Sequence, residues 1–322
     1  MNILKSNEKN LKKINYGNWA PFIALAVLFI ISSIASPYFL STRNILNILR
    51  QVSYTGMIAL GMTFVIITGG IDLSVGSMTA FVGGIAITVL NHFGGDYVAV
   101  IISVLVALVV GTLLGSLNGL LVTKLKIAPF IVTLATMSIF RSLTLYMSSA
   151  GEFRSYSSVY PNIGSSVFLG VPTPVWIFLI MAFLFHLILN NTKFGRYVCA
   201  VGYNERVAKY SAIKVDLIKF TSYALTGLAV GITAILLSSR LNSVSSSNTG
   251  LNYELDAIAA VVIGGTSMSG GKGSIVGTVI GAIILGIINN MLNMLGVSPY
   301  LQGTVKGVVI IAAVLMQYNK NK

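Results

Sequence analysis

The 322-residue sequence is 55% hydrophobic and only 9% charged, whereas an ordinary soluble domain has about 25% charged residues. A soluble chain of this composition could not cover its apolar surface with polar groups. These values exclude a water-soluble enzyme, a nucleic-acid-binding domain and a disordered chain. The net charge of +13 is therefore interpreted first as a signal of membrane topology.

Ten apolar runs recur along the chain, and a transmembrane helix needs about 20 such residues. They lie at 19–38, 48–68, 72–91, 98–122, 128–148, 174–190, 219–239, 255–268, 275–295 and 300–317. We expect an all-α fold, a polytopic membrane helical bundle of about ten transmembrane helices, forming a single transmembrane domain over residues 1–322. Because the first run is longer than the apolar part of a signal peptide, it is expected to stay as an uncleaved helix.

Lysine and arginine residues favour one orientation of this bundle. Residues 1–18 contain four lysines, which places them in the cytoplasm. With that start, most basic residues fall in inner segments. The outer segments hold only Arg43, Arg50, Arg154 and Arg240. The sequence thus predicts a multi-pass membrane protein with both termini in the cytoplasm, and its positive charge requires no nucleic acid partner.

Glycine pairs four residues apart occur within several of the apolar runs. The pairs are Gly111 with Gly115, Gly277 with Gly281, and Gly303 with Gly307. In lipid, small residues at this spacing let helix backbones approach each other closely. We therefore expect a compact bundle, although membrane helices also tolerate single glycines without such contacts.

Two segments of the chain resemble each other. The pattern in residues 111–131 recurs in residues 277–301, and on the expected topology the two copies run in opposite directions. Inverted repeats are common in transporters, where the substrate route lies near the repeat interface. We expect an inverted internal repeat, with chance similarity between two apolar hairpins as the alternative.

An aspartate interrupts the apolar sequence between the second and third runs. A charge in the bilayer is costly, so Asp72 should face protein, water or a helix end. One interpretation is that Asp72, Ser74 and Asn118 line a translocation path or mark a helix break. The favoured one is that Asp72 caps the third span. Arg141 and Lys306 also lie within apolar runs; they could reach an interface, or pair with Asp72 or Asp256.

Motifs for catalysis or cofactor binding are absent from the sequence. His92 and His186 are far apart, no cluster offers a metal-binding set, and there is no phosphate-binding G-x-x-x-x-G-K-[ST] loop. The glycine-rich segment 264–274 is predicted to be a tight cytoplasmic turn. We expect a non-catalytic chain without a cofactor or metal, so any ATP hydrolysis that drives its function must come from a partner.

The longest inner segment, residues 191–219, is predicted to be a cytoplasmic loop that contains a short amphipathic helix over residues 202–215. Asn204 can cap this helix. Its small-residue face would consist of Val207, Ala208, Ser211 and Ala212. Such a helix could dock in a groove on a cytoplasmic partner. The alternative is a helix held on the lipid surface by its basic residues.

Four motifs in this order resemble the ribose-type permease subunit of bacterial ATP-binding-cassette importers. They lie at 61–77, 127–137, 193–213 and 264–274. The resemblance implies a location in the bacterial inner membrane. It also implies a homodimer around a central route, an extracytoplasmic sugar-binding protein and a cytoplasmic ATPase. It also implies that the segment contacting the ATPase includes Asn204, Glu205, Ala208, Ser211 and Ile213. Ala212 stands where related sequences often have glycine, so the end of that helix is expected to differ.

We therefore expect a permease subunit that forms the translocation path for a monosaccharide, ribose or a similar sugar. A branched-chain amino acid or nucleoside permease of the wider superfamily is a related alternative. A secondary active transporter with its own coupling ion is a second one, weakened because few carboxylates are available inside the bundle. A membrane enzyme is least expected, because no paired acid and base is present.

Overall fold

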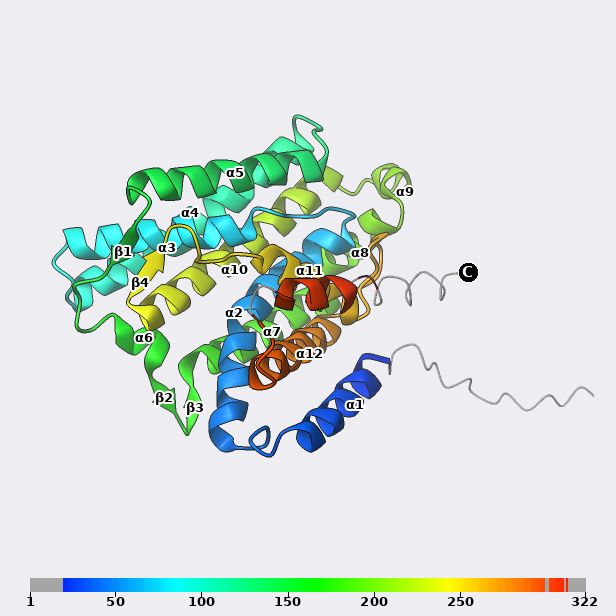
Figure 1. The fold of residues 1–322 in the computed structure, drawn as a ribbon. Coiled ribbons are helices and arrows are strands. Elements are labelled where there is room, and N and C mark those ends of the chain that lie inside the picture. The colour runs from blue at the N-terminus through cyan, green and yellow to red at the C-terminus, as the bar shows by residue number, and fades with distance from the viewer. Residues whose placement is uncertain (1–19, 299–300, 310, 312–322) are drawn as a thin grey trace, which may run out of the picture.

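A computed structural model describes residues 20–298, 301–309 and 311. The described chain is mostly helical, which confirms the all-α prediction (Figure 1). The expected cytoplasmic segment 1–18 and the end of the tenth apolar run, residues 312–317, lie outside the described residues.

The helices are α1 Ala20–Ala35, α2 Thr42–Ile67, α3 Val75–His92, α4 Tyr97–Thr123, α5 Pro129–Met147, α6 Pro161–Ser165, α7 Thr173–Asn191, α8 Lys193–Tyr203, α9 Glu205–Tyr210, α10 Val215–Leu241, α11 Tyr253–Ile263 and α12 Ile275–Met294. The strands are β1 Glu152–Arg154, β2 Val167–Phe168, β3 Val171–Pro172 and β4 Ser243–Ser245. Strand β1 pairs antiparallel with β4, and β2 pairs antiparallel with β3. A further helical segment covers residues 301–309.

Within the described residues, 7 helices are long and apolar enough to cross a membrane, namely α2, α3, α4, α5, α7, α10 and α12. Helix α1 is apolar but shorter. The predicted eighth span, residues 255–268, is wrong as a full crossing. Helix α11 has 11 residues and is about 16 Å long, whereas the hydrocarbon core is about 30 Å thick. The count of ten spans is thus not confirmed.

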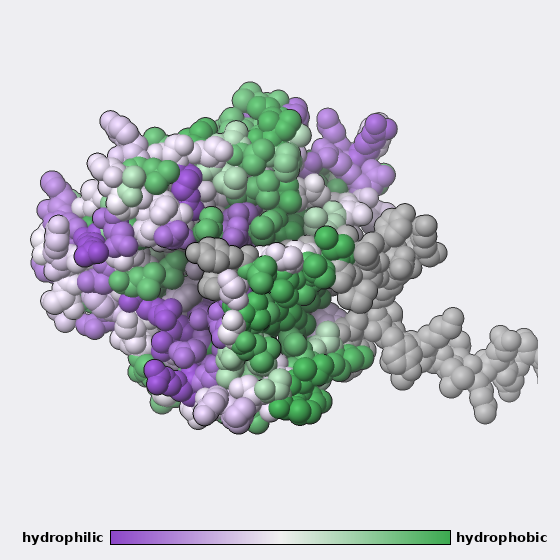
Figure 2. Space-filling model, viewed as in Figure 1, coloured by the Kyte–Doolittle hydropathy of each residue, from purple (hydrophilic) through white to green (hydrophobic). Residues whose placement is uncertain are grey.

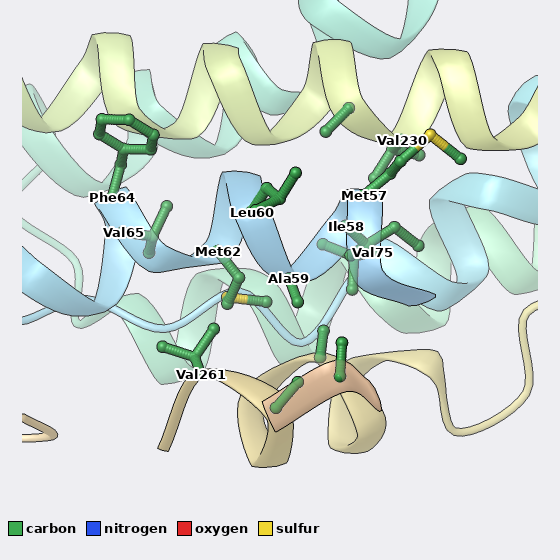
Figure 3. Packing of buried hydrophobic residues seen from close by; sticks show 14 of the residues in the cluster. Met57, Ile58, Ala59, Leu60, Met62, Phe64, Val65, Val75, Val230 and Val261 are labelled. Atoms are coloured by element: carbon green, nitrogen blue, oxygen red, sulfur yellow. The ribbon is translucent and has the colours of Figure 1, made fainter. Parts of the chain in front are cut away.

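Helix α2 lies at the centre of the bundle. Its apolar side chains pack against Val230 of α10 on one side and Val261 of α11 on the other (Figure 3). Thr63 and Thr278 join α2 to α12 through a hydrogen bond of 2.8 Å between their hydroxyls. Because α2 is surrounded by protein, its residues set the packing of the bundle, and the lipid-facing surface comes from other helices.

The turns that the sequence predicts on the inner side meet at one end of the molecule, here called the α9 end. The amide of Gly271, in the loop after α11, donates to the carbonyl of Ile67 at the end of α2 at 2.9 Å. Lys126, which follows α4, pairs with Asp216 in the first turn of α10 at 2.7 Å. The predicted alternation of the spans therefore agrees with how their ends are grouped.

The predicted outer turns meet at the opposite end, here called the β1–β4 end. Asn91, in the last turn of α3, donates to the carbonyl of Arg154 at 2.8 Å. The amide of Ser155 donates to the carbonyl of Asn242 at 3.0 Å. Ser157 donates from its hydroxyl to the carbonyl of Gly95. Three loops far apart in the sequence are thus tied together by backbone and short polar side chains.

The visible surface changes in polarity between the α9 end and the β1–β4 end. Figure 2 shows hydrophilic residues around α9 and around β1 and β4, with hydrophobic surface over α1 and α12 between them. Exposed apolar residues such as Ile34, Val109 and Phe183 are suited to lipid rather than to water. This distribution fits a multi-pass membrane protein.

Two of the three predicted glycine pairs lie at close helix contacts. A methyl group at Gly111 would lie 2.6 Å from the carbonyl oxygen of Gly227, because α4 and α10 touch backbone to backbone. A methyl group at Gly281 would lie even closer to the carbonyl oxygen of Ala260 in α11. The third pair is different, since no described atom lies within 4 Å of a methyl group built at Gly303 or at Gly307. The prediction of close packing fails there among the described residues.

Helix packing also bears on the inverted repeat. Helix α4 packs against α3 and α10, whereas α12 packs against α11 and α2. In an inverted repeat, α2, α3 and α4 would correspond to α10, α11 and α12. The contacts of α4 with α3 and α10 would then match those of α12 with α11 and α2. The inverted repeat remains a prediction, and it would pair the helices in this way.

Candidate functional site

The chain leaves the helical conformation between α2 and α3. Gly69 has a φ of +78°, a conformation that glycine adopts readily, and a methyl group at Gly70 would lie 2.9 Å from the hydroxyl of Tyr223. Helix α3 starts only at Val75, and its N-cap residue is Ser74. Residues 68–74 therefore form a break, here called the first break, that ends inside the bundle.

Asp72 organises the first break through neutral donors. Its Oδ1 accepts from the Ser74 amide at 2.9 Å and from the Ser74 hydroxyl at 2.7 Å. The prediction that Asp72 itself caps the third span is wrong in position, because Asp72 precedes the N-cap residue and binds that residue's amide. The physical principle is the same, since a short acidic side chain accepts from a free amide at a helix start.

The three residues predicted to mark a path or a break lie together. Asn118 of α4 donates to the Ser74 hydroxyl at 2.8 Å and lies 3.4 Å from Oδ2 of Asp72. Asp72, Ser74 and Asn118 are all completely buried. Sequence reasoning missed Tyr223 of α10, which donates to the carbonyl of Ile71 at 3.0 Å. A single tyrosine within an apolar run gave no signal of this contact.

The two basic residues within apolar runs have different partners. Lys306 pairs with Asp256 of α11 at 2.9 Å, one of the options that the sequence left open. Arg141 of α5 instead donates to two backbone carbonyls, those of Ser246 at 2.7 Å and Thr249 at 3.0 Å. Both cations are thus used to hold the region around the start of α11.

A second break precedes α11, in residues 246–252. The backbones of Gly76, in the first turn of α3, and Gly250, just before α11, are in contact. The other end of α11 lies at the α9 end of the molecule, where Gly264 contacts Gly277. Since α11 is about 16 Å long, it starts roughly halfway across the bundle. Two discontinuous helices thus meet in the interior, an arrangement that transporters use around substrate sites.

The predicted cytoplasmic helix is two helices, α8 and α9, here called the elbow (residues 193–213). Asn204 separates them with an extended backbone, φ −159°, so the single helix over 202–215 is wrong. Its cap is confirmed, because Oδ1 of Asn204 accepts from the Val207 amide at 3.1 Å. Ala212 follows α9 in the left-handed region with a φ of +60°, the conformation that glycine favours at a helix C-terminus.

The residues predicted to contact an ATPase do not share one face. Asn204, Glu205 and Ser211 are exposed and Ile213 is half-buried, but Ala208 is only 3% exposed. The predicted small-residue face is therefore wrong at Ala208, which packs into this chain. Sequence reasoning missed the exposed aromatic residues of the elbow, since Tyr203 and Tyr210 are 80% and 90% exposed. Their position in a polar segment was the available signal.

Further contacts attach the elbow to the bundle. Lys219 of α10 pairs with Glu205 at 2.6 Å. Gly202 of α8 contacts the carbonyl of Ile67 and the amide of Gly271, with no room for a side chain. The predicted glycine-rich turn, residues 264–274, thus lies against the elbow. The elbow therefore touches both the end of α2, where the first break begins, and the loop that follows α11.

Comparisons with known proteins agree with one another. The sequence matches the family model described as "Branched-chain amino acid transport system / permease component" over residues 44–314. It is 49% identical over 308 residues to the ribose import permease protein RbsC of Bacillus subtilis (strain 168), covering 94% of this chain and 92% of that protein. Identity to RbsC of Escherichia coli (strain K12) is 44% over 302 residues, 92% of each chain.

A relative with a different sugar in its name is more distant. The L-arabinose transport system permease protein AraH of Escherichia coli (strain K12) is 37% identical over 307 residues, 95% of this chain and 92% of that protein. No solved structure matches the sequence.

Proposed function

Because this chain belongs to the branched-chain amino acid transport system / permease component family, we propose that it is the membrane subunit of an ATP-binding-cassette importer for ribose or a similar monosaccharide. The family description names amino acids, but the relatives at 49% and 44% identity are ribose permeases. Their high coverage favours a sugar over a branched-chain amino acid or a nucleoside.

In this proposal the chain performs no chemistry of its own. A sugar-binding protein delivers the solute at the β1–β4 end, a second copy of the chain completes the central route, and an ATPase docks at the α9 end. The observation that carries the proposal is the elbow. It exposes Tyr203, Tyr210 and Arg206, and aromatic residues and arginine are enriched at protein interfaces.

The cluster of Asp72, Ser74 and Asn118 has a positioning role in this scheme. It fixes the first break to α4 and thereby sets where α3 begins beside the second break. A secondary active transporter would need accessible carboxylates for a coupling ion. Asp72 is enclosed, and Asp256 is paired with Lys306, which disfavours that alternative.

The proposal is tested by reconstituting the chain in proteoliposomes with the ATPase and binding protein encoded beside it. We expect import of D-ribose that requires ATP and the binding protein. Import by the purified chain alone, driven by an ion gradient, would instead identify a secondary transporter.

Docking at the elbow has its own test, the charge reversal Glu205→Lys. This change also breaks the pair with Lys219, so the matched control is the double variant Glu205→Lys with Lys219→Glu, which restores an ion pair inside the chain. If Glu205 contacts the ATPase, both variants lose sugar-stimulated ATP hydrolysis by about tenfold, the loss of one charged contact. Recovery in the double variant would show that Glu205 acts only within this chain.

A further inference from the structure

A polar cavity lies within the bundle between α2, α10, α11 and α12. Its volume is about 300 Å³, the lower end of the range for small-molecule sites. At about 30 Å³ per water molecule, it has room for far more than one bridging water. Among the described residues, its walls combine Tyr54, Arg240, Tyr253, Asp256 and Asn289 with apolar side chains.

Two buried polar atoms at this cavity have no hydrogen-bond partner in the part of the chain that the structure describes. Tyr54 is only 2% exposed, and its hydroxyl is unpartnered among the described residues. The guanidinium of Arg240 lies 5.9 Å from the centre of the Tyr54 ring and is close enough to interact with the hydroxyl. The side-chain oxygen of Asn289 is unpartnered as well. Buried polar groups are almost always hydrogen-bonded. These two atoms are therefore available to bind a ligand or ordered water.

The chemistry of the walls fits a polyhydroxylated molecule. Asp256 and Lys306 neutralise each other, with both carboxylate oxygens near the Lys306 ammonium at 2.9 and 3.0 Å. Arg240 supplies donors, Asn289 supplies an acceptor and a donor, and a tyrosine hydroxyl can do either. A sugar hydroxyl both donates and accepts, and the apolar C–H face of a sugar matches the apolar walls beside Val52 and Leu285.

The location of the cavity connects it to the helix breaks. Tyr253 and Asp256 belong to the first turn of α11, which begins inside the bundle. Arg240 lies in the last turn of α10, beside the β1–β4 end. Residues of both α2 and α10 line the cavity. These two helices would correspond in an inverted repeat, and transporter sites lie at the interface between such repeats.

We propose that this cavity binds one monosaccharide within each copy of the chain, reached from the β1–β4 end, so that the permease itself holds its solute in addition to conducting it. This inference rests on the proposed function. It assigns part of the selectivity to Tyr54, Asn289 and Arg240.

The test uses the full-length chain in lipid nanodiscs, without ATPase or binding protein, and measures equilibrium binding of radiolabelled D-ribose. We expect saturable binding that Tyr54→Phe weakens by about three- to tenfold, the effect of one hydrogen bond. Tyr54→Phe keeps the packed ring, and no described residue meets the Tyr54 hydroxyl in hydrogen-bonding geometry, so the variant should fold. Asn289→Leu should weaken binding by a similar factor.

The matched control is Tyr160→Phe, which removes the hydroxyl of another completely buried tyrosine. That hydroxyl bonds to Ser238 at 2.6 Å and does not line the cavity, so ribose affinity should stay unchanged. Equal affinities of Tyr54→Phe and the unaltered chain would overturn the site. So would saturable binding of inorganic phosphate without binding of ribose.

The two proposals fail in different ways. If the reconstituted importer carries ribose while the chain alone shows no saturable ribose binding, the cavity proposal is wrong and the proposed function stands. If the complete importer does not carry ribose, the proposed function is wrong irrespective of binding to the chain alone.

Discussion

Asp72 is a buried carboxylate satisfied by neutral donors from its own segment and from α4. Each donor would lose its partner if the carboxylate were replaced by an apolar group, and an unsatisfied buried donor costs about 1–3 kcal/mol. The contacts therefore explain why an acidic residue lies between two apolar helices without an opposing cation.

Replacement of Asp72 is predicted to depend on whether an acceptor remains. Asp72→Asn keeps an oxygen for the Ser74 amide and hydroxyl, so it should change the free energy of unfolding by less than about 1 kcal/mol. Asp72→Leu leaves both donors and Asn118 without that acceptor, and should cost about 3 kcal/mol. Thermal unfolding in detergent compares the two. A complete loss of transport in both variants with intact assembly would instead show that the charge is required.

Ala212 shows how one residue adapts a helix end. Its amide donates to the carbonyl of Lys209 at 3.1 Å, and the amide of Ile213 donates to the carbonyl of Ala208 at 3.1 Å. These are the two hydrogen bonds of a Schellman motif. The alanine occupies a left-handed conformation that costs an L-residue roughly 1–2 kcal/mol. The helix thus ends where a glycine would end it, and the expectation of a different end is wrong.

For single helices, the sequence predicted features that depend on neighbouring residues but not features that depend on tertiary contacts. The cap by Asn204 depends on neighbours within three residues, so the sequence predicted it. Whether Ala208 faces a partner or its own bundle depends on how the elbow lies on the rest of the chain, and the local pattern carries no such information. Helix α11 shows the same limit, since hydropathy measured an apolar run but not the early helix end at Gly264.

Close packing of α4 on α10 makes Gly111 intolerant of a side chain. Gly111→Ala places a methyl group 2.6 Å from the Gly227 carbonyl and 3.0 Å from the Gly231 Cα, so the helices must separate. We expect a loss of about 1–3 kcal/mol, typical of overpacking, measured by thermal unfolding in detergent.

The matched control for Gly111→Ala is Gly303→Ala. No described atom lies within 4 Å of the added methyl group, so the free energy of unfolding should change by less than about 0.5 kcal/mol. Equal destabilisation by the two changes would mean that alanine acts on helix conformation rather than on the contact between α4 and α10.

For the whole molecule, the grouping of the loops follows from the alternation of apolar runs. The alternation of apolar runs predicts that consecutive turns lie at opposite ends of the bundle. In the structure the inner turns meet at the α9 end and the outer turns meet at the β1–β4 end. Packing alone does not distinguish the two sides of a membrane; the basic residues do so. The three-dimensional meeting of the two breaks could not be predicted, because it joins Gly76 to Gly250 across the interior.

Orientation can be tested by labelling single cysteines with a membrane-impermeant maleimide. Cys199→Ser removes the native thiol, and Tyr203→Cys or Tyr156→Cys then adds one at an exposed position of the α9 end or the β1–β4 end. In intact spheroplasts only Tyr156→Cys should react, and both should react after permeabilisation. Labelling of Tyr203→Cys in intact spheroplasts would reverse the assigned topology.

The absence of a side chain at Gly202 has a mechanical consequence. The backbone of α8 at Gly202 contacts the backbone of Ile67 and Gly271 directly. No side chain lies between them that could change its rotamer when the elbow moves. We therefore expect a displacement of α8 to move the end of α2 and the loop that follows α11 together. Both of these segments adjoin helices that are interrupted in the middle of the bundle.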